Sequence, residues 1–587
     1  MCGIIGINEK NEKLIYDAAD GFKYRGPDAS AFFSNDLVSF GHHRLAILDL
    51  DSRSVQPMSD IDENLWIVFN GEIYNFKEIR NKLNGKYEFR TNSDTEVLIY
   101  AYKEWGAGMH KHIQGMFAFA IYDKLNQKIF LMRDHAGIKP LYYYAKDGFF
   151  VFCSEIKGIT KILRRKNIDV EIDDKSMDFY FVFGYIPSPF TLFKNIKKLQ
   201  KSSYLEYDLT ARAVAREKKY PVLYKKVDNK KEYIKLLEKK VLGHLIADVP
   251  VGVFFSGGTD SSIIASILHK YNIKLENFSI KIDYKTDDVK YFSKINNKLN
   301  IKSNVYDFDL KAFDSVYEEI MDKIDEPSYD NSIFPTYFVS KMASKKVKVV
   351  LSGEGGDEFF YGYPRSLILS KLNNKNDYSI TLLDRLFFYT PSFKSKNFIF
   401  ERLFVLFKKP VSYYLLHMSP VRDLAALKSW KIVKDECKKR NVKPLAMDQE
   451  FYLENDLLRK IDFATSYASI EGRVPLLDVD IIKNSVLFES EKLEGDILKS
   501  FLKKILSLYL PKNLVYRSKS GFGLNMVYFF KKSKFLSTDL KQAIAFLKSR
   551  KINIPKFKFN NINRMIEKYP HYCFALISLY KSIKNND

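Results

Sequence analysis

An apolar run that ends in two adjacent glycines constrains the fold of this chain more than any other stretch. Residues 251–255 (Val-Gly-Val-Phe-Phe) are typical of a buried strand, and residues 263–271 follow with a helical pattern. Gly257 and Gly258 lie between them, where adjacent glycines let the backbone come close to a ligand. The N-terminus of the following helix offers unpaired N–H groups to an anion. The stretch therefore predicts a strand, a phosphate-sized turn and a helix.

A second apolar run, residues 347–351, ends in a similar loop of small residues and carboxylates, residues 352–358. From residue 232 to residue 351 helical and strand patterns alternate, which predicts a doubly wound parallel sheet. Parallel sheets bind ligands at the carboxyl ends of their strands. We therefore expect Asp260 and Asp357, which each follow a strand, to face one Mg²⁺ through oxygen ligands.

The first glycine loop has no lysine where the Walker A pattern requires one, so the usual ATP-hydrolysing phosphate loop is a poor match. Its letters, Ser-Gly-Gly-Thr-Asp-Ser, instead resemble the SGGxDS loop of the ATP pyrophosphatases, which adenylate a substrate and release pyrophosphate. The resemblance implies that ATP is bound by Ser256, Gly257, Gly258, Asp260 and Ser261. A glycine turn of this kind is also common without a ligand, and the second loop is what favours a ligand site.

At the other end of the sequence, Cys2 follows the initiator methionine and precedes a short apolar strand. If Met1 is removed, Cys2 carries a free α-amine with a pKa near 8 that can take the thiol proton. One residue would then hold both the nucleophile and its base. A cysteine at position 2 more often has no catalytic role. The motifs that follow it distinguish a catalytic cysteine from one without function.

Four motifs follow Cys2 in order: residues 24–28, 41–49, 69–75 and 93–96. Together with Cys2 they resemble the glutaminase domain of the class II amidotransferases. Taken singly, each motif has a plain structural explanation, such as a surface ion pair, a helix cap or, for Asn-Gly in the third, a hairpin turn. Their order, with the cysteine at the chain terminus, favours the glutaminase.

This resemblance implies a role for each motif. The Asn70 side chain and the Gly71 N–H would form an oxyanion hole, which supplies about 3 kcal/mol per donor. Arg44 would bind the α-carboxylate of glutamine, while Glu72 and Asp94 would meet its α-ammonium group. One wall of the pocket would be formed by Arg44, Leu45, Ala46, Ile47 and Leu48.

The resemblance also implies the fold of the first half, an α+β N-terminal nucleophile domain built as an αββα sandwich. Residues 116–123 and 128–134 read as two of its strands, joined by a short turn. His42 and His43 are interpreted as structural, because the expected base is the terminal amine.

In the second half, residues 325–327 (Asp-Glu-Pro), 471–478 and 517–523 complete a similarity to the glutamine-hydrolysing asparagine synthetases over nearly the whole chain. Residues 364–460 match no motif. The fold implied here is an α/β doubly wound parallel-sheet ATP-pyrophosphatase domain. The resemblance divides the chain into a glutaminase domain (1–208), a polar linker (209–231) and a synthetase domain (232–587).

Within the synthetase domain the resemblance assigns further roles. Phe254 and Ile280 would line the adenine pocket. Lys519 would stabilise charge on the α-phosphate, and Glu354 would assist formation of the acyl-adenylate and its attack by ammonia. The nucleotide would also contact Ser352 and Gly353. Groups for an amino-acid acceptor are expected among Asp357, Glu358 and Arg365.

The activity implied is a ligase reaction that uses glutamine, MgATP and a carboxylate. Cys2 would release ammonia from glutamine, and the second site would adenylate aspartate and release pyrophosphate, so that ammonia displaces AMP. An amidotransferase acting on a sugar uronic acid or another carboxylate, in surface polysaccharide synthesis, stays open as an alternative. A third reading, an inactive scaffold or RNA-binding protein, conflicts with the retention of Cys2, Asn70, Asp94, Asp260, Asp357 and Lys519.

Composition adds the remaining expectations. The net charge of +23 lies entirely beyond residue 208, because residues 1–208 hold 28 basic and 28 acidic side chains. No RNA-binding motif accompanies it, so we expect small-molecule substrates and no nucleic acid. No apolar run approaches the roughly 18 residues needed to span a bilayer, and no signal-peptide pattern is present, which predicts a cytoplasmic protein without a membrane partner. A homodimer is left open.

Overall fold

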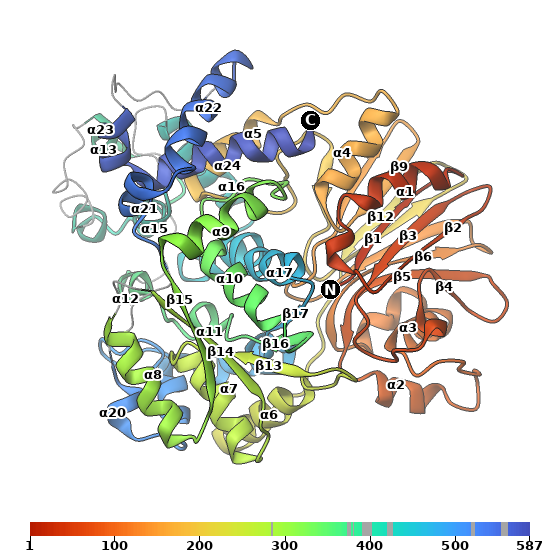
Figure 1. The fold of residues 1–587 in the computed structure, drawn as a ribbon, viewed down its shortest axis with the longest axis horizontal. Helices are drawn as coiled ribbons and strands as arrows, with labels where there is room; N and C mark the ends of the chain where they lie inside the picture. Colours follow the sequence, from red (N-terminus) through yellow and green to blue (C-terminus); the bar gives the residue numbers. More distant parts are fainter. Residues whose placement is uncertain are drawn as a thin grey trace.

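The computed structural model describes residues 1–282, 286–372, 377–379, 381–389, 402–419, 426–517, 523–552, 554 and 562–587. Two antiparallel sheets with their helices lie on one side of the molecule, and a parallel sheet with its helices lies on the other (Figure 1). No helix in the described part of the chain is long and apolar enough to cross a membrane.

The N-terminal part is a sandwich of two six-stranded antiparallel sheets. One sheet has the order β10 (Ile196–Lys198), β8 (Tyr142–Lys146), β9 (Phe149–Cys153), β1 (Gly3–Ile7), β3 (Ser39–Arg44) and β2 (Ala29–Ser34). The other has the order β12 (Ala213–Lys219), β11 (Ser203–Asp208), β7 (Lys128–Arg133), β6 (Gly115–Asp123), β5 (Leu65–Ile73) and β4 (Met58–Ser59). The predicted strands at 116–123 and 128–134 are confirmed.

Helices cover both outer faces of this sandwich. The first sheet is covered by α1 (Glu12–Asp20) and α4 (Ile156–Arg165), and the second by α2 (Phe76–Leu83) and α3 (Asp94–Trp105). The side chains of β6 alternate between the two layers: Ala118 and Ala120 face the other sheet, whereas Phe117 and Phe119 face α3. Every residue of β6 is therefore buried, and the αββα architecture expected from the resemblance is confirmed.

One strand lies inside the segment expected to be a linker, residues 209–231. β12 pairs along β11 at the edge of the second sheet, and all seven of its residues are exposed. The ordered N-terminal sheet thus extends past residue 208 to Lys219, because backbone hydrogen bonds hold a strand that buries no side chain.

The C-terminal part contains the predicted parallel sheet, and all its pairings are parallel. Its order is β15 (Ser303–Phe308), β14 (Glu276–Ile282), β13 (Val251–Phe254), β16 (Val349–Leu351) and β17 (Glu471–Arg473). One face packs on α6 (Lys230–Gly243), α7 (Thr259–Lys270) and α8 (Thr286–Lys298), and the other on α9 (Leu310–Met321), α10 (Ile333–Ala343) and α17 (Leu458–Tyr467). The doubly wound fold is confirmed.

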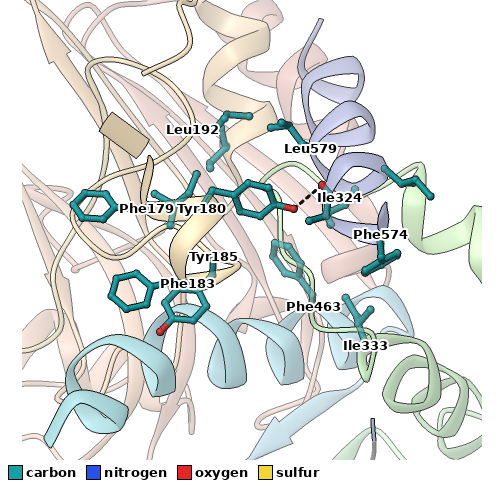
Figure 2. Packing of buried hydrophobic residues seen from close by; sticks show 14 of the residues in the cluster. Phe179, Tyr180, Phe183, Tyr185, Leu192, Ile324, Ile333, Phe463, Phe574 and Leu579 are labelled. Atoms are coloured by element: carbon teal, nitrogen blue, oxygen red, sulfur yellow. Dashed lines mark hydrogen bonds between the residues drawn. The ribbon is translucent and has the colours of Figure 1, made fainter. Parts of the chain in front are cut away.

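A layer of helices joins the two parts. α5 (Asp174–Phe183) belongs by sequence to the first half, yet it packs against α16 (Ala426–Lys439) of the second. Figure 2 shows Tyr180 of α5 reaching α24 (Pro570–Asn586), where its hydroxyl donates to the Ala575 carbonyl oxygen at 2.7 Å. The two halves therefore share one apolar core.

Candidate functional sites

Cys2 directly precedes β1 and lies between Asn70 of the second sheet and the loop that contains Leu45. Its backbone N–H donates to Asn70 Oδ1 at 3.1 Å, and its Sγ lies 3.9 Å from the Leu45 carbonyl oxygen. Arg25 Nε donates to the Cys2 carbonyl oxygen at 3.1 Å. Strand pairing of β1 with β3 and β9 fixes the residue from the C-terminal side, so the thiol is held beside the predicted oxyanion-hole residue.

Asn70 and Gly71 lie inside β5, opposite Ala118 and Phe117 of β6, so the alternative of a simple hairpin turn at this dipeptide does not apply. Asn70 is fully buried, and its Nδ2 has no hydrogen-bond partner within the described residues. A Cβ at Gly71 would lie 2.1 Å from the Met116 carbonyl oxygen, so only glycine fits. A buried amide donor left unpaired is costly unless a ligand completes it, which suits an oxyanion hole.

Met1 covers this site in the full chain. It is buried, and burial lowers the pKa of its α-amine to about 5. Burial likewise raises the pKa of the Cys2 thiol above its usual value. Both shifts disfavour a reactive thiolate while Met1 is attached.

The predicted carboxylate-binding arginine turns toward backbone carbonyls. Arg44 donates to Asp51 O at 2.9 Å, to Leu48 O at 3.2 Å and to Asp49 O. It thereby shapes the loop that was predicted as the glutamine pocket wall. Leu45 and Ile47 of this loop pack against Val349 of the parallel sheet, so the loop also contacts the second half.

Glu72 and Asp94 are both buried at the C-terminal end of β5. Asp94, the first residue of α3, accepts from the Ile73 N–H at 3.0 Å, and burial raises its pKa to about 7. Glu72 Oε2 accepts from Arg473 at 2.8 Å, while its Oε1 has no partner within the described residues. Burial also raises the pKa of Glu72 well above its usual value. Glu72 is thus already paired with a protein cation, and the assignment of both carboxyls to the α-ammonium group of glutamine stays a prediction.

Arg473 connects this first site with the second half. Its side chain comes from β17 and is fully buried, with Glu72 and Glu471 each at 2.8 Å. Its backbone carbonyl oxygen accepts from the Ser352 N–H at 2.8 Å. In the sequence this arginine is only one member of the 471–478 motif, because nothing in the pattern indicates that it reaches the N-terminal domain.

The second site is a cavity of about 400 Å³ at the carboxyl ends of β13, β14 and β16. It brings together nearly all the residues predicted for the nucleotide: Phe254, Ser256, Gly258, Asp260, Ser261, Ile280, Ser352, Gly353, Glu354 and Asp357. Gly257 lines an adjoining cavity of about 640 Å³ on the other side of the loop. Lys519 lies outside the described residues.

The glycine loop begins α7 in the way that its sequence predicts. Gly257 has φ +68°, Gly258 caps the helix, and no side chain caps the helix N-terminus there. A Cβ at Gly356 would lie 2.2 Å from Asp260 Oδ1, so glycine is what allows the second loop to approach the first. The loops therefore present backbone N–H groups and carboxylates to one cavity.

A lysine that sequence analysis missed lies between the two predicted metal ligands. Lys499 Nζ lies 2.7 Å from Asp357 Oδ1 and also binds Asp260. Burial alone would lower its pKa, but the two carboxylates hold it above its usual value. The described residues contain no group of three or more His, Cys, Asp or Glu side chains arranged to hold a metal. Asp260 and Asp357 converge on the Lys499 ammonium group. Carboxylate oxygens are also the donors that Mg²⁺ uses together with substrate phosphates, so the two residues fit the predicted metal.

Arg365, one of the residues expected to bind the acceptor, is engaged elsewhere. Its guanidinium makes three hydrogen bonds to the Asp448 carboxylate, the shortest of 2.7 Å, and it does not line the 400 Å³ cavity. Glu358 does line it, and burial together with Asp357 raises the pKa of Glu358 to about 7.

Comparison with known proteins matches both halves to described families. A family described as "Glutamine amidotransferase domain" matches residues 1–220, and one described as "Asparagine synthase" matches residues 232–554. A "Putative asparagine synthetase [glutamine-hydrolyzing] 2" of Methanocaldococcus jannaschii is 38% identical over 62% of this chain and 76% of its own. "Asparagine synthetase [glutamine-hydrolyzing] 1" of Bacillus subtilis is 30% identical over 90% of this chain and 88% of its own.

Proposed function

The chain belongs to the asparagine synthase family, and from this premise we propose that it converts aspartate to asparagine with glutamine as nitrogen donor and ATP as energy source. The observation that best supports this is the cavity at the strand ends, where both predicted loops meet. The two relatives named above are described as asparagine synthetases, one of them as putative, and neither description mentions a sugar uronic acid.

At the first site we assign the chemistry to Cys2 after loss of Met1. The freed α-amine takes the thiol proton, and the thiolate attacks the side-chain carbonyl of glutamine. The Asn70 amide and the Gly71 N–H bind the developing oxyanion, ammonia leaves, and water hydrolyses the thioester to glutamate. Glu72 and Asp94 hold the α-ammonium group of glutamine, and Arg44 orients the loop around its carboxylate.

At the second site the aspartate β-carboxylate attacks the α-phosphorus of ATP, and pyrophosphate leaves. Mg²⁺ bound by Asp260 and Asp357 would offset the charge of the phosphates. Lys499, which pairs with both carboxylates, would meet the negative charge of the departing pyrophosphate. Ammonia then attacks the acyl-adenylate, with Glu354 beside the reacting carbonyl, and AMP leaves.

We further propose a glutaminase unit that ends after β12 and a synthetase unit that begins with α6. The remaining polar residues between them would form the linker. A cytoplasmic location suits both reactions, since glutamine, aspartate and ATP are dissolved metabolites.

The experiment that tests the function separates the two sites. Purified enzyme with aspartate, MgATP and either glutamine or ammonium should form asparagine, AMP and pyrophosphate in equal amounts. Cys2→Ala should abolish glutamine-dependent synthesis and retain ammonium-dependent synthesis, because it removes only the first nucleophile. Stoichiometric ADP, or normal glutamine turnover by Cys2→Ala, would contradict the mechanism. Release of pyrophosphate with a uronic acid but not with aspartate would exclude asparagine synthesis.

A further inference from the structure

Part of the 400 Å³ cavity is lined by residues that were not assigned to the nucleotide. Asp330 and Ser332 come from the segment just before α10, Lys460 comes from α17, and Tyr452 comes from the π-helical turn (Asp448–Leu457) that leads into α17. This end of the cavity also includes Glu358. π-Helical turns often occur at functional sites, because the wider turn redirects side chains.

Lys460 and Asp330 form an ion pair within this wall. Lys460 Nζ lies 3.4 Å from Asp330 Oδ2, and the two side chains are 12% and 18% exposed. Asp330 Oδ1 accepts from the Ser332 N–H at 2.9 Å, and the Asp330 N–H donates to Ser328 Oγ at 3.2 Å. The Ser332 N–H thus holds the Asp330 carboxylate in place. The Lys460 ammonium group has further N–H donors besides the one directed at Asp330, and these point elsewhere.

Both groups stay charged at neutral pH. Burial alone would raise the pKa of Asp330, but Lys460 and the Ser332 hydrogen bonds lower it below its usual value. Burial alone would lower the pKa of Lys460, but Asp330 and Glu354 raise it above its usual value.

Among the described residues that line this cavity, Lys460 is the only cation, against five carboxylates. Asp260 and Asp357 already bind Lys499. Arg365 is held by Asp448, as described above. Among the described residues that line the cavity, Lys460 is therefore the one cationic side chain that can pair with a negatively charged group.

We propose that Lys460 and Asp330 form the acceptor subsite, in which Lys460 binds the α-carboxylate of aspartate and Asp330 binds its α-ammonium group. The inference rests on the proposed function and deepens it. A zwitterionic amino-acid head is complementary to a protein ion pair, because each charge meets its opposite and neither buried group is left unpaired. The β-carboxylate is then free to reach the α-phosphate.

The test uses as inhibitors two analogues of aspartate that each lack one of its charged groups. Succinate keeps the carboxylates and lacks the ammonium group, whereas β-alanine keeps the ammonium group and lacks the α-carboxylate. Aspartate-dependent pyrophosphate release is measured at saturating MgATP and ammonium. Lys460→Gln should raise the KM for aspartate and the Ki for succinate by about 10- to 100-fold and leave the Ki for β-alanine nearly unchanged. Asp330→Asn should raise the KM for aspartate and the Ki for β-alanine similarly and spare succinate.

Matched controls are Lys341→Gln and Glu319→Gln, which break a half-exposed ion pair elsewhere on α9 and α10 and should change none of these constants. Glutaminase activity and the KM for ATP report whether each variant folds, and Lys460→Arg, which keeps the charge, should raise the KM less than Lys460→Gln. An unchanged KM for aspartate, or a similar rise in both Ki values for either variant, would overturn the subsite. Absence of aspartate-dependent pyrophosphate release in the unaltered enzyme would instead overturn the proposed function.

Discussion

Asp94 carries a carboxyl group whose pKa burial raises from 3.8 to about 7. The folded state therefore binds this proton more tightly than the unfolded state does. Its stabilising contribution is fully present below about pH 4 and is lost as the pH rises through about 7. Asp94→Asn removes this titration. The free energy of unfolding of the variant, relative to that of the unaltered protein, should therefore rise by ~4 kcal/mol between pH 4 and pH 8.

Urea denaturation at several pH values checks this prediction. Ser93→Ala is a matched control, since Ser93 caps the same helix but does not titrate in this range. A free-energy difference between Asp94→Asn and the unaltered protein that stays constant with pH would show that the Asp94 carboxyl is not the titrating group.

The residues that could be predicted from the sequence are those that lie in short local patterns. Cys2, Asn70 and the two glycine loops belong to such patterns, and the structure brings the loops together in one cavity. Lys499 and Lys460 could not be found in this way, because single lysines among 94 basic residues carry no signal. Tertiary packing of α17 and of α19 (Ser500–Leu506), which Lys499 directly precedes, brings them to the site.

Among the elements, β17 has the largest consequence for both sites. Its Arg473 is a buried cation shared by Glu72 and Glu471. Arg473→Met leaves these carboxylates without their cation, so we expect a loss of about 3–5 kcal/mol in the free energy of unfolding. Adding Glu72→Gln should restore part of this loss, because it removes one of the two unpaired charges.

A double-mutant cycle by thermal or chemical denaturation measures the coupling between these two residues. Lys346→Met, which breaks an exposed pair with Glu276, serves as the control and should change stability by less than about 1 kcal/mol. Strictly additive effects of Arg473→Met and Glu72→Gln would contradict the ion pair.

The strands that were predicted and those that were missed differ in a physical way. β6, β7 and β13 show apolar runs because their side chains enter the core. β12 is an exposed, charged edge strand held by backbone bonds, and β17 has only three residues, two of them charged. Neither carries the hydrophobic periodicity from which a strand is predicted.

Across the whole molecule, buried ion pairs and a shared core tie the two halves together. Arg25 reaches Asp462 at 2.8 Å, and Arg133 reaches Glu454 at 2.7 Å, with all four side chains nearly inaccessible. We expect both halves to unfold in one calorimetric transition, and 1 M salt should not split it, because buried pairs are screened weakly.

Differential scanning calorimetry with and without salt measures this behaviour, and glutaminase activity followed through the transition reports the first half separately. Two resolved peaks, or salt-induced separation of them, would contradict a common cooperative unit. Asp462→Asn, which leaves Arg25 with Glu155 as its remaining carboxylate partner, should lower the midpoint for both halves together.

The packing of α5 against α24 has a consequence for the order in which the protein is made. The Tyr180 hydroxyl and the Ala575 carbonyl that it binds are 395 residues apart in the chain. At a synthesis rate of about 5–20 residues per second, roughly 20–80 s pass between the synthesis of α5 and that of α24. During that time the part of the apolar face in Figure 2 that packs on α24 lacks this helix. We therefore expect the nascent glutaminase half to keep part of this apolar face exposed until α24 emerges.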